Sequence, residues 1–387
     1  RLKGGPGVGK TEALLGRVAQ LASGKKETLY LTYNLTLINE LRTRYATISN
    51  LGASSTTWLN FHEWCKRLSL QFGFEREWAS LFKDADNDQG PYETVGNFIS
   101  QQLSNLSIPD EFKFDAIIVD EAQDMHISWI KAALLFLRPA GELLIAADTR
   151  QDIYERSSDW TNETISGLGF TGPWLTLNSS HRTPYYLVPL INKFKSQFLD
   201  SSSFEDMPDL SSDVPRTGQL SLGDKLELHP CTEENLTENA YEVIHKLIEQ
   251  DRKALSGAAD RSVEDITVLV PTKQIGIEIA QKLGDHNIKI ETTFEVSGLS
   301  GNLSERDLKL GFSTRSGEVK ISTIHSFKGM SGSRVVLILI NRRSQSYKSE
   351  VYVGLSRLKA GALGHSMFLV SSNNELNLFF QSNQIQL

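Results

Sequence analysis

The chain has 387 residues, of which 40% are hydrophobic and 22% are charged, a composition typical of a soluble globular protein with two or three domains. Its net charge of −7 excludes an overall basic surface, so any contact with nucleic acid must be local. No apolar stretch is long enough to predict a membrane span, and Cys65 and Cys231 have no spacing that indicates a zinc site or a disulfide framework. We therefore expect a cytoplasmic protein that does not bind a membrane.

The first predicted element is a phosphate-binding loop, in the segment RLKGGPGVGKTEAL that opens the chain. The loop pattern G-x-x-x-x-G-K-[ST] needs glycines so that backbone N–H groups converge on the phosphates, a lysine for charge and a hydroxyl for Mg²⁺. Every defined position matches, in the residues Gly4, Gly5, Pro6, Gly7, Val8, Gly9, Lys10 and Thr11. A chain that begins at such a loop also suggests that an N-terminal portion is missing.

Buried strands and amphipathic helices alternate after this loop. Short segments rich in β-branched residues and leucine predict parallel strands at 28–33, 114–124, 142–148, 265–271, 319–324 and 334–340. Apolar residues at three- and four-residue spacing predict helices at 12–21, 35–45, 129–137, 187–198, 240–249 and 275–283. This alternation predicts an α/β fold with parallel sheets.

An acidic pair ends the predicted strand in AIIVDEAQD. A carboxylate at this place can hold Mg²⁺ together with the hydroxyl of Thr11, and a second one can polarise the attacking water. We assign the metal to Asp120 and the water to Glu121. With the loop at Lys10, the pair predicts ATP and Mg²⁺ as cofactors.

The segment DEAQD (120–124) resembles a motif of the UvrD/Rep-like group of superfamily 1 DNA helicases, and the resemblance extends over almost the whole chain. Motifs similar to those of that family follow in the family's order. They are LYLTYN (29–34), LNFHEWC (59–65), ADTRQDIY (147–154), SSHRT (179–183), STIHSFKGM (322–330) and VYVGLSRLK (351–359).

The resemblance implies two tandem RecA-like P-loop domains that hydrolyse ATP between them. It places Gln151 near the γ phosphate and supplies Arg182 and Arg357 from the second domain, where both would contact the nucleotide and stabilise charge in the transition state. We expect residues 1–176 to form the first domain, with a small helical insertion at about 66–111, and residues 177–387 to form the second.

The resemblance also implies a groove for a single strand of DNA. Phosphates would be held by backbone and hydroxyl groups, and bases would stack on aromatic rings. The matching positions are Thr32, Tyr33, Asn34, Phe61, His62, Trp64, Tyr154, Thr323 and His325, with Trp160 as a further candidate. Aromatic residues at such spacings also occur in protein cores, so both interpretations stay open.

Four features depart from the family. No adenine-binding motif precedes Arg1, and Arg156 stands where the family has a base-stacking aromatic. Ser331 and Gly332 replace a glutamate that helps to hold the nucleotide, and the accessory insertions are reduced. Because separating a duplex costs about 1.4 kcal/mol per base-pair step, a motor without accessory domains can move on a single strand yet unwind poorly.

These features favour an ATP-dependent DNA helicase or translocase, and the resemblance implies movement from 3′ to 5′. Single-stranded or partly duplex DNA is the expected partner. The alternative is an ATP-driven switch that senses DNA and regulates an attached or separate nuclease or effector without unwinding. An RNA helicase of the same superfamily also stays open.

Overall fold

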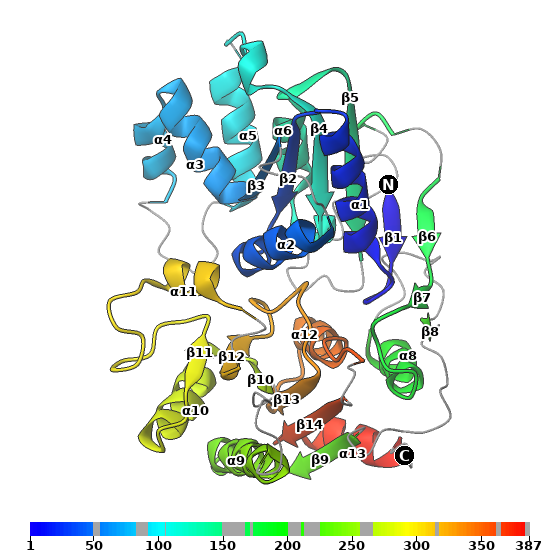
Figure 1. The fold of residues 1–387 in the computed structure, drawn as a ribbon, viewed down its shortest axis with the longest axis vertical. Helices are drawn as coiled ribbons and strands as arrows, with labels where there is room; N and C mark the ends of the chain where they lie inside the picture. Colours follow the sequence, from blue (N-terminus) through cyan, green and yellow to red (C-terminus); the bar gives the residue numbers. More distant parts are fainter. Residues whose placement is uncertain are drawn as a thin grey trace. The chain divides into compact units, whose positions relative to one another are not determined.

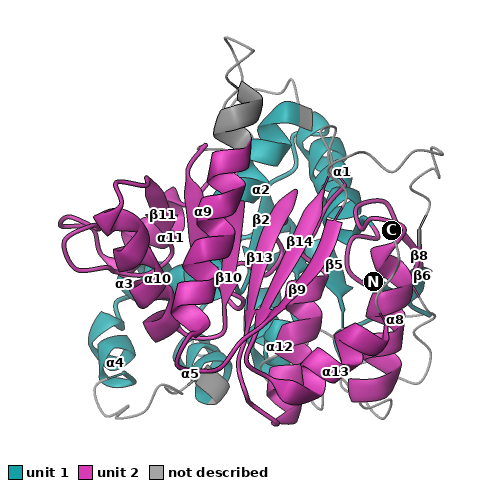
Figure 2. Ribbon diagram, turned by 90° about the horizontal axis from the view of Figure 1, so that it is seen from below, with its two compact units in different colours: residues 1–4, 9–177 teal, residues 5–8, 178–387 magenta. Residues whose placement is uncertain are grey.

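The computed structural model describes residues 1–48, 55–82, 92–104, 106–148, 167–170, 173–199, 210–212, 225–255, 266–313, 317–360 and 365–383 (Figure 1). Their contacts divide the chain into two compact units (Figure 2). Unit 1 comprises Arg1–Gly4 and Gly9–Leu177, and unit 2 comprises Gly5–Val8 and Asn178–Leu387. The predicted domains divide the sequence at nearly the same place, and their independent folding stays a prediction.

The sheet of unit 1 is six-stranded and parallel, with the order β3-β2-β4-β5-β1-β6. The strands predicted at 28–33, 114–124 and 142–148 correspond to β2, β4 and β5, but β4 already ends at Asp120 and β5 begins earlier than predicted, at Leu137. No strand was predicted at β1, β3 or β6. The strand bounds are β1 Leu2–Gly4, β2 Thr28–Thr32, β3 Thr56–Asn60, β4 Phe114–Asp120, β5 Leu137–Ala147 and β6 Leu175–Leu177.

Helices connect these strands, and α3, α4 and α5 lie in the region of the predicted helical insertion. The helix predicted at 129–137 is too long, because Leu137 already pairs with Phe114 as the first residue of β5. An unbroken apolar run hides the end of that helix in the sequence. The bounds are α1 Lys10–Ser23, α2 Leu35–Ile48, α3 Phe61–Phe72, α4 Glu75–Ser80, α5 Tyr92–Leu103, α6 Ile127–Leu134, and the short η1 Asp110–Phe112 and η2 Ala122–Asp124.

Unit 2 contains a second parallel sheet of six strands, in the order β11-β12-β10-β13-β14-β9, and a small pair formed by β7 and β8. The main strands are β9 Lys225–Pro230, β10 Ile266–Val270, β11 Ile290–Thr292, β12 Val319–Thr323, β13 Arg334–Leu339 and β14 Ser366–Ser371, and the pair is β7 Ser179–Ser180 with β8 Ser211–Ser212. Its helices are α8 Leu187–Phe198, α9 Leu236–Leu255, α10 Lys273–Asp285, α11 Glu305–Gly311, α12 Gln345–Leu355 and α13 Asn374–Ser382.

Both faces of this second sheet are covered by helices. Val336 and Ile338 of β13 belong to a buried cluster with residues of α9 and α10. Leu337, which points the opposite way, lies against Gly354 of α12. This layering explains the continuous apolar strand sequences and, with the first sheet, confirms the α/β class with two RecA-like units.

The parallel arrangement positions the candidate site in unit 1. Strands β2, β4 and β5 point the same way, so their carboxyl ends at Thr32, Asp120 and Ala147 share one edge of the sheet. Strand β1 is parallel to β5 and leads into the glycine-rich loop at this edge. In open parallel sheets, ligands bind outside the carboxyl ends of the strands.

In the described part of the chain, none of the helices combines the length and the apolar character of a membrane span.

The tight contact between α5 and α6 generates a stability prediction. A Cβ atom added to Gly96 would lie 2.5 Å from the backbone carbon of Ser128, so Gly96→Ala forces the two helices apart. We expect a loss of about 1–3 kcal/mol in urea unfolding. The matched control is Gly16→Ala in α1, where no atom lies within 4 Å of the added Cβ and helix propensity alone stabilises by up to about 1 kcal/mol. Equal effects of the two substitutions would contradict this packing.

Candidate functional site

The glycine-rich loop has a backbone that only glycine adopts easily. Gly7 and Gly9 have φ angles of 75° and 91°, in the left-handed region. Within unit 2, the N–H of His181 donates to the carbonyl of Gly7 at 3.0 Å, and a Cβ on Gly7 would lie 2.6 Å from Ser180 Oγ. The SSHRT segment therefore packs directly on the loop, a contact that the motif alone does not predict.

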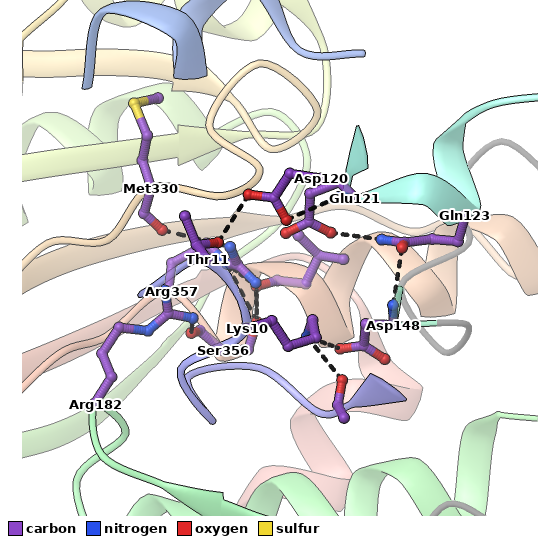
Figure 3. Close-up of polar contacts among 12 residues, drawn as sticks. Lys10, Thr11, Asp120, Glu121, Gln123, Asp148, Arg182, Met330, Ser356 and Arg357 are labelled. Atoms are coloured by element: carbon purple, nitrogen blue, oxygen red, sulfur yellow. Dashed lines mark hydrogen bonds and ion pairs between the residues drawn. The ribbon is translucent and has the colours of Figure 1, made fainter. Parts of the chain in front are cut away.

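Lys10 lies at the start of α1 and is almost fully buried. Its ammonium donates to the carbonyl of Gly4 at 2.7 Å and lies 3.8 Å from Asp148 Oδ2 (Figure 3). Asp148 follows directly after β5 and is fully buried. These contacts hold a positive charge beside the loop, where phosphate oxygens need it.

Asp120 is the fully buried carboxylate at the end of β4. Its Oδ2 accepts hydrogen bonds from Thr11 Oγ1 at 2.9 Å and from Tyr30 OH at 3.0 Å. Burial raises the pKa of Asp120 to about 6, and the negative charge of Glu121 adds to the rise. The hydrogen bonds from Thr11 and Tyr30 and the charge of Lys10 oppose it.

The oxygen donors at this place suit Mg²⁺. Magnesium is usually held by one or two carboxylates together with phosphates and water, and Thr11 and Asp120 supply a hydroxyl and a carboxylate that are in contact. A divalent cation would also favour the ionised form of the buried carboxylate. The two residues predicted as metal ligands therefore fit the ion.

Glu121 has an unusual backbone for a residue other than glycine, with φ 53° and ψ 45°. Gln123 Nε2 donates to Glu121 Oε2 at 2.5 Å, and Gln123 Oε1 accepts from the backbone N–H of Asp148 at 2.8 Å. The amide of Gln123 thus connects the ends of β4 and β5 and orients the second carboxylate (Figure 3). Strained backbone of this kind is concentrated at functional sites.

Three contributors to this network, Tyr30, Gln123 and Asp148, were not assigned a role from the sequence. Tyr30 lies inside LYLTYN, in a strand that is buried along its whole length, and its place there does not show that its hydroxyl faces Asp120. Asp148 had a usable signal, because it follows the apolar strand segment LLIAA just as Asp120 follows AIIV.

The two arginines predicted to act on the nucleotide meet at one residue of unit 2. Arg182 donates to the carbonyl of Ser356 at 3.2 Å, and Arg357 donates to its Oγ at 2.7 Å. Arg357 is also buried, with further bonds to the carbonyls of Val353 at 3.0 Å and Met330 at 3.4 Å (Figure 3). The guanidinium of Arg357 therefore ties the end of α12 to the segment after β12.

That segment carries the predicted contacts Thr323 and His325. Thr323 is buried and its Oγ1 donates to Ser326 Oγ at 3.0 Å. His325 Nε2 lies 3.8 Å from the Glu350 carboxylate. Burial, and then the charge of Lys328, lower the pKa of His325 to about 4, so its imidazole is neutral at physiological pH.

The predicted nucleic-acid contacts in unit 1 fall into two groups. Phe61 and Trp64 are buried in the core of unit 1, where Phe61 stacks on Trp129 with centroids 4.5 Å apart and Trp64 meets the edge of Phe136 at 5.2 Å. Their rings therefore have the core role that the sequence left open. Tyr33, Asn34 and His62 are partly exposed, whereas Thr32 is buried.

The predicted γ-phosphate sensor Gln151 and the aromatic candidates Tyr154 and Trp160 lie outside the described residues, as does Arg156.

Comparison with known families supports the nucleotide site. Residues 1–157 match the model of a family described as "AAA domain". Those residues include the glycine-rich loop, both carboxylates and Asp148. A search of curated proteins found no match. The match and the geometry together show a P-loop NTPase domain in the first part of the chain.

The bridging role of Gln123 can be tested through stability. Gln123→Leu keeps the volume but leaves the buried Asp148 N–H and the Glu121 carboxylate without this partner, so we expect a loss of about 1–3 kcal/mol in urea unfolding. Gln101→Leu, at an exposed position of α5, is the matched control and should change stability by less than about 0.5 kcal/mol. A Gln123→Leu protein as stable as the control would show that the bridge contributes nothing.

Proposed function

We propose that the chain is an ATP-driven motor of the superfamily 1 type, which hydrolyses ATP to move along single-stranded DNA from 3′ to 5′. The observation that carries the proposal is the contact network at the strand ends of unit 1. In this network Thr11 of the phosphate loop donates a hydrogen bond to the buried carboxylate of Asp120. The carboxylate of the next residue, Glu121, is held by the side-chain amide of Gln123.

Each residue of this network has a role in the proposed reaction. The loop N–H groups and Lys10 bind the phosphates, and Thr11 and Asp120 hold Mg²⁺, which neutralises charge on the phosphates when it is bound. Glu121 orients water and accepts its proton, with its carboxylate held by Gln123.

Arg182 and Arg357 are proposed to stabilise the charge that develops on the γ phosphate. Their convergence on Ser356 supports a shared role, because one small shift of this residue would move both guanidinium groups. Coupling of hydrolysis to strand movement would then pass through α12 and the segment that contains Met330.

The proposed roles of Lys10 in ATP binding and of Glu121 in hydrolysis predict different defects in two variants. Lys10→Ala should abolish tight ATP binding, because the phosphates lose their buried charge. Glu121→Gln should bind ATP as well as the unchanged protein but turn it over about 10²- to 10⁴-fold more slowly, because the general base is gone. A fluorescent ATP analogue and a phosphate-release assay measure the two effects.

Lys26→Ala, which removes an exposed lysine, is the control for this pair. Undiminished turnover in both variants would exclude the assignment. The same assay with DNA and RNA oligonucleotides distinguishes the substrate, and duplexes with a 3′ or a 5′ tail report direction. Turnover that depends on DNA without movement would favour the switch over the motor.

A separate prediction concerns Arg357. Arg357→Ala should lower turnover by about 10³-fold or more and weaken ATP binding far less, because the arginine acts on the transition state. Since Arg357 also makes buried hydrogen bonds in unit 2, Arg357→Lys and a urea unfolding curve separate catalysis from folding. Arg343→Ala, at an exposed arginine of unit 2, is the control. Equal losses in binding and turnover would count against the transition-state role.

A further inference from the structure

Tyr30 is a buried polar side chain to which the proposed reaction gives no role. It lies in the middle of β2 and is fully buried, and its hydroxyl lies 3.0 Å from Asp120 Oδ2. A phenol keeps its proton at neutral pH and an ionised carboxylate has none to give, so the hydroxyl donates. Although Tyr30 belongs to a motif that indicated nucleic-acid contacts at Thr32 and beyond, its hydroxyl is directed at the candidate metal site.

The ring of Tyr30 is held in place by aromatic neighbours. Tyr30 pairs with Trp58 across β2 and β3, and the two rings are stacked with centroids 4.7 Å apart. Tyr45 of α2 packs on the same indole at 5.3 Å. Side chains directly opposite each other on neighbouring strands share one face of the sheet, so strand pairing itself brings Tyr30 and Trp58 together. Because the ring is buried and stacked, the position of its hydroxyl is fixed by packing.

Asp120 accepts hydrogen bonds on both carboxylate oxygens. Oδ2 accepts from Thr11 and Tyr30, and Oδ1 accepts from the backbone N–H of Glu121 at 3.0 Å. Of the two side-chain donors, Thr11 is itself a proposed ligand of Mg²⁺. Tyr30 reaches the carboxylate from β2, a strand that carries neither proposed ligand, so it can hold the carboxylate whether or not the ion is bound.

We propose that Tyr30 is a positioning residue of the magnesium site, whose hydroxyl holds Asp120 Oδ2 beside Thr11. The proposal rests on the proposed function and adds a residue to it. Groups that hydrogen-bond to metal ligands fix the orientation of those ligands, and their removal typically weakens metal binding about 10- to 100-fold. Since Tyr30 acts through Asp120, its loss should weaken the binding of Mg²⁺ and leave the charge of Lys10 beside the phosphate loop unchanged.

A role in folding alone would give a different result. The hydroxyl of Tyr30 also satisfies a buried carboxylate, so its removal can lower stability without any part in metal binding. The Mg²⁺ requirement of nucleotide binding separates the two roles, because a loss of stability alone does not change the affinity of the folded protein for the ion.

The test compares Tyr30→Phe with the unchanged protein and with Tyr45→Phe. Tyr30→Phe keeps the stacked ring and removes only the hydroxyl, and Tyr45→Phe makes the same change in the other ring on Trp58. A fluorescent ATP analogue that is not hydrolysed reports nucleotide binding over a range of Mg²⁺ concentrations and in EDTA. Electron paramagnetic resonance measures the Mn²⁺ that binds together with the analogue.

We expect Tyr30→Phe to need about 10- to 100-fold more Mg²⁺ for half-maximal binding of the analogue, and to bind Mn²⁺ correspondingly more weakly. Its affinity for the analogue in EDTA should equal that of the unchanged protein. Saturating Mg²⁺ should restore its ATP turnover, because the proposed reaction does not use the hydroxyl. Tyr45→Phe should match the unchanged protein in every measurement.

Each outcome decides the proposal. If Tyr30→Phe keeps the Mg²⁺ requirement of the unchanged protein, or loses affinity equally with Mg²⁺ and in EDTA, the positioning role is wrong while the proposed motor stands. If the unchanged protein binds no nucleotide, or binds it without regard to Mg²⁺, the proposed function itself fails.

Urea unfolding curves show whether the variants are folded. Should Tyr30→Phe not fold, Trp58→Phe decides, because it keeps the hydroxyl of Tyr30 but reduces the stacking that holds the ring. A raised Mg²⁺ requirement in Trp58→Phe would support the proposal, and an unchanged one would contradict it.

Discussion

The structure of unit 1 depends on how one buried carboxylate is accommodated. Asp120 is removed from water at the end of a central strand, where an unpartnered charge would be strongly destabilising. Hydrogen bonds from Thr11 and Tyr30 satisfy it and bring the phosphate loop and β2 to the same point. The hydrogen bonds that the buried carboxylate of Asp120 accepts therefore hold the start of α1 and strand β2 at the place where a nucleotide would bind.

The residues next to Asp120 are also held by hydrogen bonds between polar side chains and the backbone. Glu121 adopts a left-handed backbone, and Gln123 secures its carboxylate by joining it to the backbone after β5. In unit 2, the buried Arg357 plays a comparable part, because its guanidinium gathers carbonyl and hydroxyl groups from two segments. Groups with proposed functional roles thus also hold the fold together, so substitutions there need a stability measurement beside each activity measurement.

Much of the fold and of the nucleotide site could be predicted because the signals are local. The strands β2, β4 and β10 are short apolar segments, which predict buried strands without knowledge of their neighbours. The loop before Lys10 contains glycines because its backbone adopts positive φ angles. The acidic pair could also be predicted, because Asp120 and Glu121 stand at the end of an apolar strand segment and the same chain contains a phosphate-binding loop. Short strands such as β1 and β6 escaped prediction because pairing, rather than propensity, forms them.

The sequence by itself determined the chemistry: which groups are available for phosphate, metal and water, and the alternation that builds a parallel sheet. Only the tertiary structure decided which aromatic residues serve the core and which remain partly exposed. Phe61 and His62 are neighbours in one motif, yet one is buried against Trp129 and the other lies at the rim of the same indole. His126 joins that rim from a distant segment, because burial and contact depend on how adjacent strands bring remote residues together.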